Sequence, residues 1–322
     1  MRLVFFGSPQ VAVPFLEICA AADGWEMAAV VAQPDREAGR GMKLRSPAVA
    51  DAAKRLGLTL RQPTKSSEIL SVLEEFKPDL CVVVAYGRIL KADVLAAAKF
   101  GFLNVHFSLL PKFRGAAPVQ WSLIEGEAKS GVTLFWLDEG MDTGPIQSLV
   151  ETPVDPNEDA LQLFGRLVDL GKDALGKTLE DIRSGTVRRE DQAGEASLAS
   201  KIKPDFGRIS FNMPAITVHN RVRGLRAGPS CFLSLKLEGD RNLRLKVLKT
   251  ELESAEDSSE SSESAPPGSV VRVDANKGIL VQLSPGRLWF REVQPEGKKQ
   301  QSSADFLNGL RLGAGDSLVA IP

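Results

Sequence analysis

The chain has 322 residues, of which 43% are hydrophobic and 25% charged, with a formal net charge of −1. This composition is typical of a globular protein and excludes collagen-like, low-complexity and strongly charged disordered chains. No apolar run approaches the about 20 residues that a membrane helix needs, and three scattered cysteines lack disulfide or metal-ligand spacing. We therefore expect a soluble, cytoplasmic protein with two domains.

Residues 1–150 alternate short apolar runs with amphipathic stretches, which is typical of βαβ units on a mostly parallel, Rossmann-like sheet. A long amphipathic helix is predicted over 157–183. With it, the first domain would span residues 1–187 and would be the catalytic domain. The first helix is expected over about 11–22, with Ser8 as its N-cap. The predicted strands are Leu3–Phe6, Met27–Ala32, Leu80–Ala85, Phe102–Val105, Val132–Trp136 and Ile146–Val150.

A nucleotide site is not indicated in this α/β domain. The first turn, Gly7–Val11, lacks the Gly-x-Gly-x-x-Gly pattern, and no Walker-type loop occurs. Ligands of such sheets still bind at the carboxyl ends of the strands. This rule predicts that Tyr86–Leu90, Asn104–His106 and the loop after Trp136 share one edge.

In the second half of the chain, short strand-like segments replace the alternation of strands and helices. Residues 188–205 are polar without a clear period and are interpreted as a linker. A helix is expected over Met213–Leu225, with Ile216 and Val222 facing inward, and short strands predict a small β-barrel or sandwich over 206–322. The predicted strands are Arg208–Phe211, Phe232–Leu237, Leu243–Thr250, Ser269–Val273, Gly278–Leu283 and Arg287–Val293.

The second domain is basic once one tract is set aside. Residues 206–322 hold 16 Lys/Arg and 13 Asp/Glu, and six of those acids lie in a Ser/Glu-rich tract at 251–263. We expect the low-complexity residues 254–264 to form a surface loop. A basic domain suits a polyanionic partner, although a well-solvated surface explains the charge equally well.

Three polar side chains follow or end predicted strands: Asn104, His106 and Asp142. Each alone is common in turns or in structural roles. Together they suit acyl transfer to an amine: a carboxamide donates to the oxyanion, a histidine moves the proton, and a carboxylate orients and charges the histidine. No Ser or Cys nucleophile with a base partner is evident, so we expect direct transfer without a covalent enzyme intermediate.

The segment Asn104-x-His106-x-Ser108-Leu-Leu-Pro111, followed by Arg114-Gly115, resembles the motif of the formyltetrahydrofolate-dependent formyltransferase family. The resemblance implies that Asn104, His106 and Asp142 are catalytic and that 10-formyltetrahydrofolate is the co-substrate, with no metal. It also implies a folate pocket formed by Tyr86, Gly87, Arg88, Ile89, Leu90, Ser108, Leu109, Leu110, Pro111 and Asp138. Phe107 departs from the small residue that the family often has at this position.

The acceptor is indicated by the segment Gln33–Pro47, a predicted loop with four cations in ten residues. It resembles a Pro-Asp-Arg-x-x-Gly-Arg-Gly loop of family members that formylate methionyl-tRNA, and residues from about 206 resemble their OB-like tRNA-binding domain. This implies formyl transfer to the α-amino group of initiator methionyl-tRNA, for initiation of protein synthesis. Apart from the resemblance, we expect the protein to be a monomer. The implied tRNA-binding residues are Arg36, Arg40, Lys43, Arg45, Lys298 and Lys299.

Two alternatives remain open from the sequence. A family member could instead act on a sugar-nucleotide or another small amine, or hydrolyse formyltetrahydrofolate. A protein of a different class, a nucleic-acid-binding protein with a non-catalytic α/β scaffold, would share the basic segments but lack formyl transfer.

Overall fold

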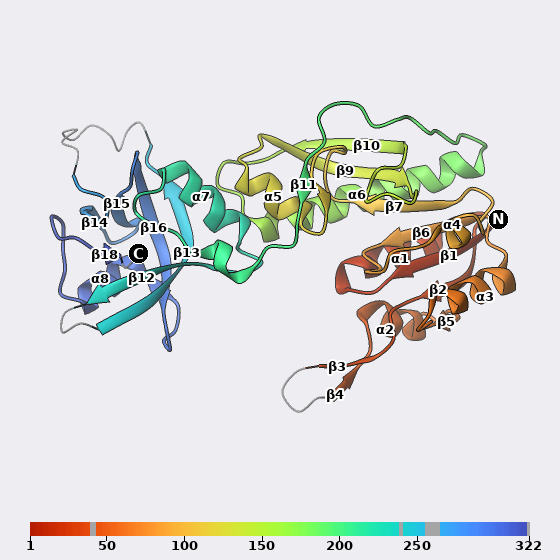
Figure 1. Ribbon diagram of the computed structural model, residues 1–322, viewed down its shortest axis with the longest axis horizontal. Helices are drawn as coiled ribbons and strands as arrows, with labels where there is room; N and C mark the ends of the chain where they lie inside the picture. The colour runs from red at the N-terminus through yellow and green to blue at the C-terminus, as the bar shows by residue number, and fades with distance from the viewer. Residues whose placement is uncertain (39–42, 238–240, 255–264, 321–322) are drawn as a thin grey trace. The chain divides into compact units, whose positions relative to one another are not determined.

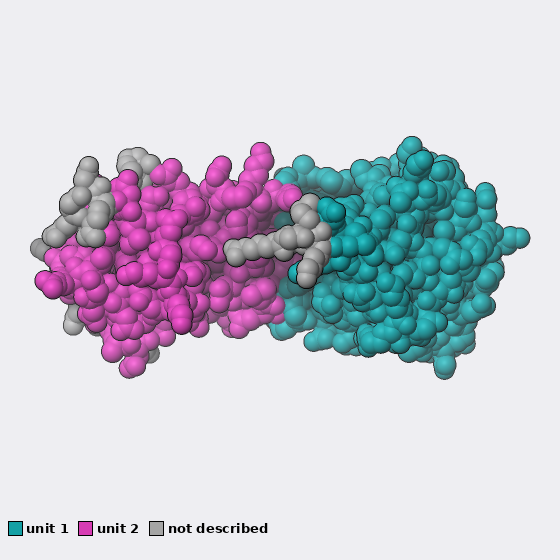
Figure 2. Space-filling view, turned by 90° about the horizontal axis from the view of Figure 1, so that it is seen from below, with its two compact units in different colours: residues 1–118, 129–153, 164–200 teal, residues 119–128, 154–163, 201–322 magenta. Residues whose placement is uncertain are grey.

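The structure is a computed structural model that describes residues 1–38, 43–237, 241–254 and 265–320. The chain forms two compact units (Figures 1 and 2). Unit 1 comprises residues 1–118, 129–153 and 164–200, and unit 2 comprises residues 119–128, 154–163 and 201–322. The segment 188–200 belongs to unit 1 by its contacts, whereas the domain limits 1–187, 188–205 and 206–322 stay a prediction.

Unit 1 is built on a seven-stranded sheet (Figure 1). Four neighbouring pairs, from β7 to β5, are parallel, while β9 is antiparallel to both β7 and β10. The prediction of a mostly parallel, Rossmann-like sheet is therefore confirmed. The strands in spatial order are β10 (Ile146–Pro153), β9 (Lys129–Trp136), β7 (Phe102–His106), β6 (Leu80–Val84), β1 (Arg2–Gly7), β2 (Glu26–Val31) and β5 (Leu60–Arg61).

The central strands are buried on both faces, as their apolar runs predict. On one face, Phe6 packs against the rings of Tyr86 and Phe102, in a core shared with α3 (Ser66–Phe76) and α4 (Ala92–Leu95). The other core includes Phe107, whose ring centroid lies 6.0 Å from that of Phe15 on α1 (Val13–Ala21). The Phe107 and Phe164 centroids are 5.0 Å apart, and Phe164 lies on the long helix α6 (Ala160–Arg183). Phe107 is thus a core residue of unit 1.

Ser8 does not cap a helix, contrary to expectation. A 3-10 turn, η1 (Gln10–Ala12), precedes α1, and neither has a side-chain cap. The Ser8 hydroxyl instead donates to the Tyr86 carbonyl and accepts the Gln33 amide, both at 3.2 Å. A hydroxyl satisfied by distant strand ends is not available for the helix terminus, so the local N-cap signal was overridden by tertiary contacts.

The segment expected to be a loop after the second strand contains a β-hairpin, β3 (Arg36–Ala38) and β4 (Lys43–Arg45). The hairpin projects from unit 1 before α2 (Ala48–Arg55) (Figure 1). Its base is held by Asp35, whose carboxylate accepts hydrogen bonds from Gln62 at 2.7 Å and Ser46 at 3.0 Å. Those bonds lower the pKa of Asp35.

Unit 2 is dominated by a curled antiparallel sheet, a half-barrel that confirms the expected second, OB-like β-domain. Register shifts along β13 mark β-bulges, which bend and twist a strand. The sheet elements are β14 (Val270–Asp274), β15 (Gly278–Gln282), β16 (Arg287–Pro295), β13 (Arg241–Leu252), β12 (Cys231–Leu237), β18 (Val319–Ala320) and β17 (Gln301–Ser302), which pairs with β16. The helices are α5 (Pro118–Ile124), η2 (Pro204–Gly207), α7 (Ala215–Gly224) and α8 (Ser303–Gly309).

Two expectations for unit 2 are wrong. The predicted strand Arg208–Phe211 makes only an isolated bridge between Arg208 and Phe232, and Phe211 turns into the apolar core. Ile216 on α7 is 51% exposed, whereas Val222 is buried as expected. Both errors arise because a short apolar run does not determine whether a strand finds a partner or which face of a helix is buried. The Ser/Glu tract lies, from residue 255 to 264, outside the described residues.

Helix α7 is anchored by buried polar groups. His219 Nε2 donates to the Pro156 carbonyl at 3.0 Å, and its Nδ1 lies 3.0 Å from the Thr250 hydroxyl. Arg223 donates to the carbonyls of Asp155 and Glu158. His219, expected to be structural, is held in this way within unit 2. No helix of the described residues is long and apolar enough to cross a membrane.

Candidate active site

The site is built around the last residues of β7. Asn104 and His106 are two residues apart on this strand, so their side chains leave the same face of the sheet. Asn104 pairs with Val83 of β6 and Phe135 of β9, which places it inside the sheet rather than at a frayed end. Within the described residues its carboxamide has no hydrogen-bond partner. A carboxamide without a protein partner on a partly buried strand is suited to binding an oxygen of a ligand.

His106 is buried, and its hydrogen bonding fixes its tautomer. Nε2 lies 2.9 Å from the Phe113 carbonyl, which can only accept, so Nε2 carries the proton. In the neutral ring, Nδ1 is then bare. Nδ1 lies 3.7 Å from Oδ2 of Asp142. That separation is too long for a direct hydrogen bond but short enough for a strong charge interaction.

The pKa of His106 is lowered overall, because burial disfavours the imidazolium. The Asp142 carboxylate and the Phe113 carbonyl act in the opposite direction and raise the pKa. The balance leaves a ring that is neutral near pH 7 and whose charged form is stabilised by one adjacent carboxylate. Such a ring can accept a proton at Nδ1 and release it again.

The loop after β7 is held by its own hydrogen bonds. The Ser108 hydroxyl donates to the Lys112 carbonyl at 2.7 Å, and buried Thr133 of β9 bonds both the Ser108 carbonyl and the Leu110 amide. Phe113 adopts a left-handed φ of 61°, which turns its carbonyl to His106. Ser108, predicted to line the folate pocket, thus also shapes the loop that orients the histidine.

Asp142 reaches His106 by an unexpected route. The prediction that the loop after Trp136 lies at the same sheet edge as the end of β7 is wrong. β9 runs antiparallel to β7, and Trp136 at its end pairs with Leu103, near the start of β7. The loop 137–144 instead folds back. Asp138 Oδ1 accepts bonds from the Gly140 amide at 3.0 Å and the Thr143 hydroxyl at 2.7 Å.

Two glycines permit that return. A Cβ on Gly144 would meet the Trp136 carbonyl at 1.8 Å, so no other residue fits there. Gly115, with φ 120°, donates its amide to Asp142 Oδ2 at 2.7 Å. Asp142 itself has a left-handed φ of 56°, a conformation that the surrounding contacts must maintain.

The expected folate segment follows β6, the parallel neighbour of β7. Tyr86 and Leu90 are buried, whereas Ile89 is 86% exposed. The Tyr86 carbonyl accepts bonds from Ser8 and from Gln33 Nε2, and Gly87 has a φ of 78°. The structure therefore brings His106 and Asp142 together, with the Ser108–Pro111 loop adjoining them, and places the 85–90 turn on the neighbouring strand.

The predicted tRNA residues are distributed over both units. Arg36 and Arg45 face each other across the β3–β4 hairpin, and Arg36 donates to Gln33 Oε1 at 3.3 Å. Lys43 lies on β4, and Arg40 lies outside the described residues. Lys298 and Lys299 are exposed in the turn after β16.

Sequence reasoning missed the groups that hold His106 and Asp142. They are the Phe113 carbonyl, the Gly115 amide and Gln192, whose amide lies 2.8 Å from the Asp142 carbonyl. The motif Arg114-Gly115 indicated a role for this glycine only by resemblance. Nothing in the aperiodic segment around Gln192 marked it.

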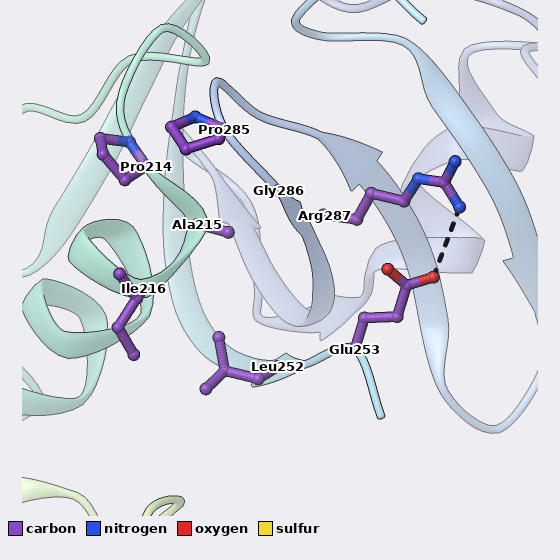
Figure 3. Close-up of a pocket in the computed structure, with 8 residues that line it drawn as sticks. All are labelled: Pro214, Ala215, Ile216, Leu252, Glu253, Pro285, Gly286 and Arg287. Carbon is purple, nitrogen blue, oxygen red and sulfur yellow. Dashed lines mark ion pairs between the residues drawn. The ribbon is translucent and has the colours of Figure 1, made fainter. Parts of the chain in front are cut away.

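Unit 2 contains a separate pocket of about 410 Å³ (Figure 3). Ile216 and Leu252 lie on one side and the Arg287–Glu253 ion pair, at 3.5 Å, on the other. None of the predicted site residues lines it. No group of three His, Cys, Asp or Glu side chains in the described part of the chain could hold a metal ion.

Comparisons with known proteins match both halves of the chain. The family model "Formyl transferase" matches residues 1–179, and "Formyl transferase, C-terminal domain" matches residues 201–311. The methionyl-tRNA formyltransferase of Elusimicrobium minutum is 39% identical over 98% of this chain and 99% of its own length. The enzyme of the same name from Solibacter usitatus is 40% identical over 99% of this chain and 98% of its own.

Solved structures share the fold at lower identity. An N-formyltransferase from Helicobacter canadensis, in complex with folinic acid and dTDP-3-aminofucose, has a TM-score of 0.64 and 20% identity over 90% of this chain and 98% of its own. HypX from Aquifex aeolicus, in complex with tetrahydrofolic acid, has a TM-score of 0.59 and 16% identity over 98% of this chain. The chain spans about half of HypX, 48% of its length.

Proposed function

The chain belongs to the formyl transferase family, and from this premise we propose that it transfers a formyl group from 10-formyltetrahydrofolate to the α-amino group of methionine on initiator tRNA. Relatives that carry the methionyl-tRNA formyltransferase name align over nearly the whole chain at 36–40% identity, which supports this acceptor. The solved sugar formyltransferases align at lower identity and support only the fold. The product would serve initiation of protein synthesis in the cytoplasm, with the enzyme acting as a monomer.

The reaction requires two proton movements and one stabilised charge. The amine nitrogen forms a bond to the formyl carbon while the formyl oxygen gains negative charge. The bond from that carbon to N10 of the folate then breaks, the amine has lost one proton, and N10 gains one. An α-amino group has an ordinary pKa of about 8, so about one tenth of it is already neutral and nucleophilic at pH 7. Oxyanion stabilisation and proton transfer are therefore the main tasks of the protein.

The observation that carries the proposal is the His106–Asp142 pair, placed on the same face of the sheet as the free Asn104 carboxamide. In our proposal Asn104 donates a hydrogen bond to the formyl oxygen. This bond stabilises the negative charge that develops on that oxygen during attack by the amine. Bare Nδ1 of His106 takes the proton of the incoming amine and passes it toward N10. Nδ1 and Oδ2 of Asp142, 3.7 Å apart, are both acceptors when the ring is neutral, so a donor from the substrate or a water lying beside the pair would hydrogen-bond to them.

The folate would lie beside this pair. We propose that the backbone of Tyr86–Leu90 binds the pterin edge, because Gly87 and Ile89 are exposed there while the Tyr86 ring is buried in the core. Ser108–Pro111 and the loop that begins at Asp138 would form the remaining walls. Their internal hydrogen bonds make a rigid pocket, which suits recognition of a flat ring.

The acceptor RNA would be bound by the β3–β4 hairpin and by unit 2. Cations on a projecting hairpin favour phosphate contacts, which position a nucleic acid without reading its sequence. Arg36, Arg40, Lys43 and Arg45 would make these contacts, with Lys298 and Lys299 of unit 2 binding elsewhere on the tRNA.

The deciding experiment compares acceptors with the purified protein and 10-formyltetrahydrofolate. We expect formylation of initiator methionyl-tRNA and none of free methionine or of an aminosugar nucleotide. Preferential transfer to the aminosugar nucleotide would support the alternative of a small-amine formyltransferase. Release of formate without any acceptor would support a hydrolase, and an inactive wild type that still binds tRNA would support a non-catalytic binding protein.

A further inference from the structure

Residues 188–200, which form most of the predicted linker 188–205, make many contacts within unit 1. Arg189 lies over the Trp136 ring at 4.3 Å from its centroid and donates to the Phe100 carbonyl at 2.6 Å. Glu190 and Ile146 exchange both backbone hydrogen bonds, at 2.7 and 3.0 Å. We call this segment the strap. The strap also contacts the loop 137–144, which carries Asp142, and the segment that follows β7.

The far end of the strap pairs directly with the loop after β7. β11 (Leu198–Ala199) lies parallel to β8 (Arg114–Gly115), and the Ala199 carbonyl accepts the amides of Ala116 and Ala117. The Ser197 hydroxyl accepts the Phe113 amide at 2.9 Å. The residue whose carbonyl fixes the His106 tautomer is therefore itself held by the strap.

Gln192 lies in the middle of the strap and uses all of its hydrogen-bonding capacity. Its Oε1 accepts from Arg114 Nη2 at 2.6 Å and Nε at 3.2 Å. Its Nε2 donates to the carbonyls of Asp142 at 2.8 Å and Gly144 at 2.9 Å. A carboxamide has two donor hydrogens and two acceptor lone pairs, and all four are used.

These four bonds join two loops that are far apart in sequence. Arg114 precedes Gly115, whose amide binds the Asp142 carboxylate, and Nε2 binds the backbone of Asp142 itself. Both ends of Asp142 are thus fixed through Gln192: the backbone directly, and the carboxylate through the Arg114–Gly115 turn. Asp142 also has a left-handed φ, a less populated conformation that these contacts stabilise.

We propose that Gln192 is a positioning residue for the formyl transfer, and that it sets the distance between the Asp142 carboxylate and Nδ1 of His106. The inference rests on the proposed function, which it deepens by adding a residue from a segment outside the motif. Gln192 contacts no reacting atom and acts through Asp142.

The chain offers a direct readout, because it contains only two histidines, His106 and His219. In histidine-labelled protein each ring gives one NMR titration curve. The curve that disappears in His219→Gln belongs to His219, and the other belongs to His106. Asp142 is the charged group that acts on His106 and raises its pKa. If the carboxylate moves away in a Gln192 variant, the pKa of His106 must fall further below its ordinary value.

Gln192→Met keeps the length of the side chain and removes its four hydrogen bonds. We expect a lower pKa for His106, an unchanged curve for His219, and a kcat about 10- to 100-fold lower, as for a displacement of about 1 Å at a reacting group. Gln192→Asn, which keeps an amide but is one methylene shorter, should give a smaller shift in the same direction and serves if the Met variant does not fold. The control Gln300→Met loses an exposed bond to Glu292 in unit 2 and should change neither quantity.

The outcomes separate this inference from the proposed function. A folded Gln192→Met protein with the wild-type His106 curve overturns the positioning role, even if the wild type formylates methionyl-tRNA. A shifted curve in a protein that formylates no acceptor supports the positioning role while refuting the proposed function. A change only in thermal stability, with titration and kcat retained, reduces Gln192 to a structural residue and overturns the inference.

Discussion

Oδ2 of Asp142 lies 3.7 Å from Nδ1 of His106, on the side of the ring that carries no proton in its neutral tautomer. A carboxylate facing a bare nitrogen gains interaction energy only when a proton lies between them. The pair is therefore arranged for the charged intermediate of a proton transfer rather than for the resting neutral ring.

Asp142→Asn removes this charge and retains an oxygen for the Gly115 amide. The pKa of His106 should fall, since burial then acts without its main opposing charge. The acidic limb of the pH–rate profile should move to lower pH, and the plateau rate should drop about 100-fold because the imidazolium is no longer stabilised. A profile unchanged in both respects would contradict the role given to the pair.

Asn104→Ala should lower kcat about 10²- to 10³-fold, the usual effect of removing one oxyanion donor. Its carboxamide has no partner in the described part of the chain, so the melting temperature should stay within about 2 °C of the wild type. Binding of methionyl-tRNA, measured by filter retention, should be unchanged. Equal losses in binding and turnover would point to a positioning role in place of an oxyanion donor.

Gly115→Ala tests the turn that carries the Asp142 contact. With φ at 120° and a Cβ that would lie 2.9 Å from the Ala199 carbonyl, alanine is both strained and obstructed. We expect a loss of about 1–3 kcal/mol in the free energy of unfolding and a sharp fall in kcat. Gly185→Ala is the matched control: its φ is 92°, but no atom lies within 4 Å of the new Cβ. It should cost stability and leave kcat intact.

His219 should make stability depend on pH. Burial lowers its pKa in the folded protein, and the ring accepts from Thr250 only when it is neutral. The unfolded histidine, with its ordinary pKa of about 6.5, therefore takes up a proton before the folded one does. The contribution to stability is complete above that pH and is lost as the pH falls from there through the lower pKa of the folded state. Urea unfolding at pH 7.5 and 5.5 should show a smaller difference in His219→Gln than in the wild type. His106, which is depressed in the same direction, should account for part of the remaining difference.

Arg45→Ala should weaken tRNA binding and reduce the slope of log K against log[salt] by about 1, as for one lost phosphate contact. The rate at saturating tRNA should change little. Arg55→Ala on the nearby helix α2 is a suitable control, because that arginine is paired with Glu17 at 2.9 Å. Identical salt slopes in wild type and Arg45→Ala would remove the hairpin from the tRNA interface.

Local sequence signals predicted the elements that depend on burial. The apolar run Leu80–Ala85 is β6, ending one residue earlier at Val84, and the predicted strand Phe102–Val105 is β7 extended to His106. Both are central strands, where apolar side chains are required on each face. Asn104 and His106 became candidate site residues because a rare histidine, an asparagine and a resemblance coincided in one segment.

The remaining features depend on partners that are distant in sequence. Ser8 was misjudged because its partners, Tyr86 and Gln33, are 78 and 25 residues away. The direction of β9 was not evident, because an apolar run is the same in a parallel and an antiparallel strand. Gln192 carried no signal at all, since a polar residue in an aperiodic segment is indistinguishable from solvated chain until its hydrogen-bond partners are known.

The attachment of the strap to the β7 loop also has a consequence for the order of biosynthesis. A ribosome releases a chain from its N-terminus, and domains fold as they emerge. When residues 1–187 have emerged, Asn104, His106 and Asp142 are all present, but neither Gln192 nor the β11 partner of Gly115 has yet arrived. The nascent sheet therefore carries the candidate catalytic side chains before it carries the contacts that position Asp142 beside His106.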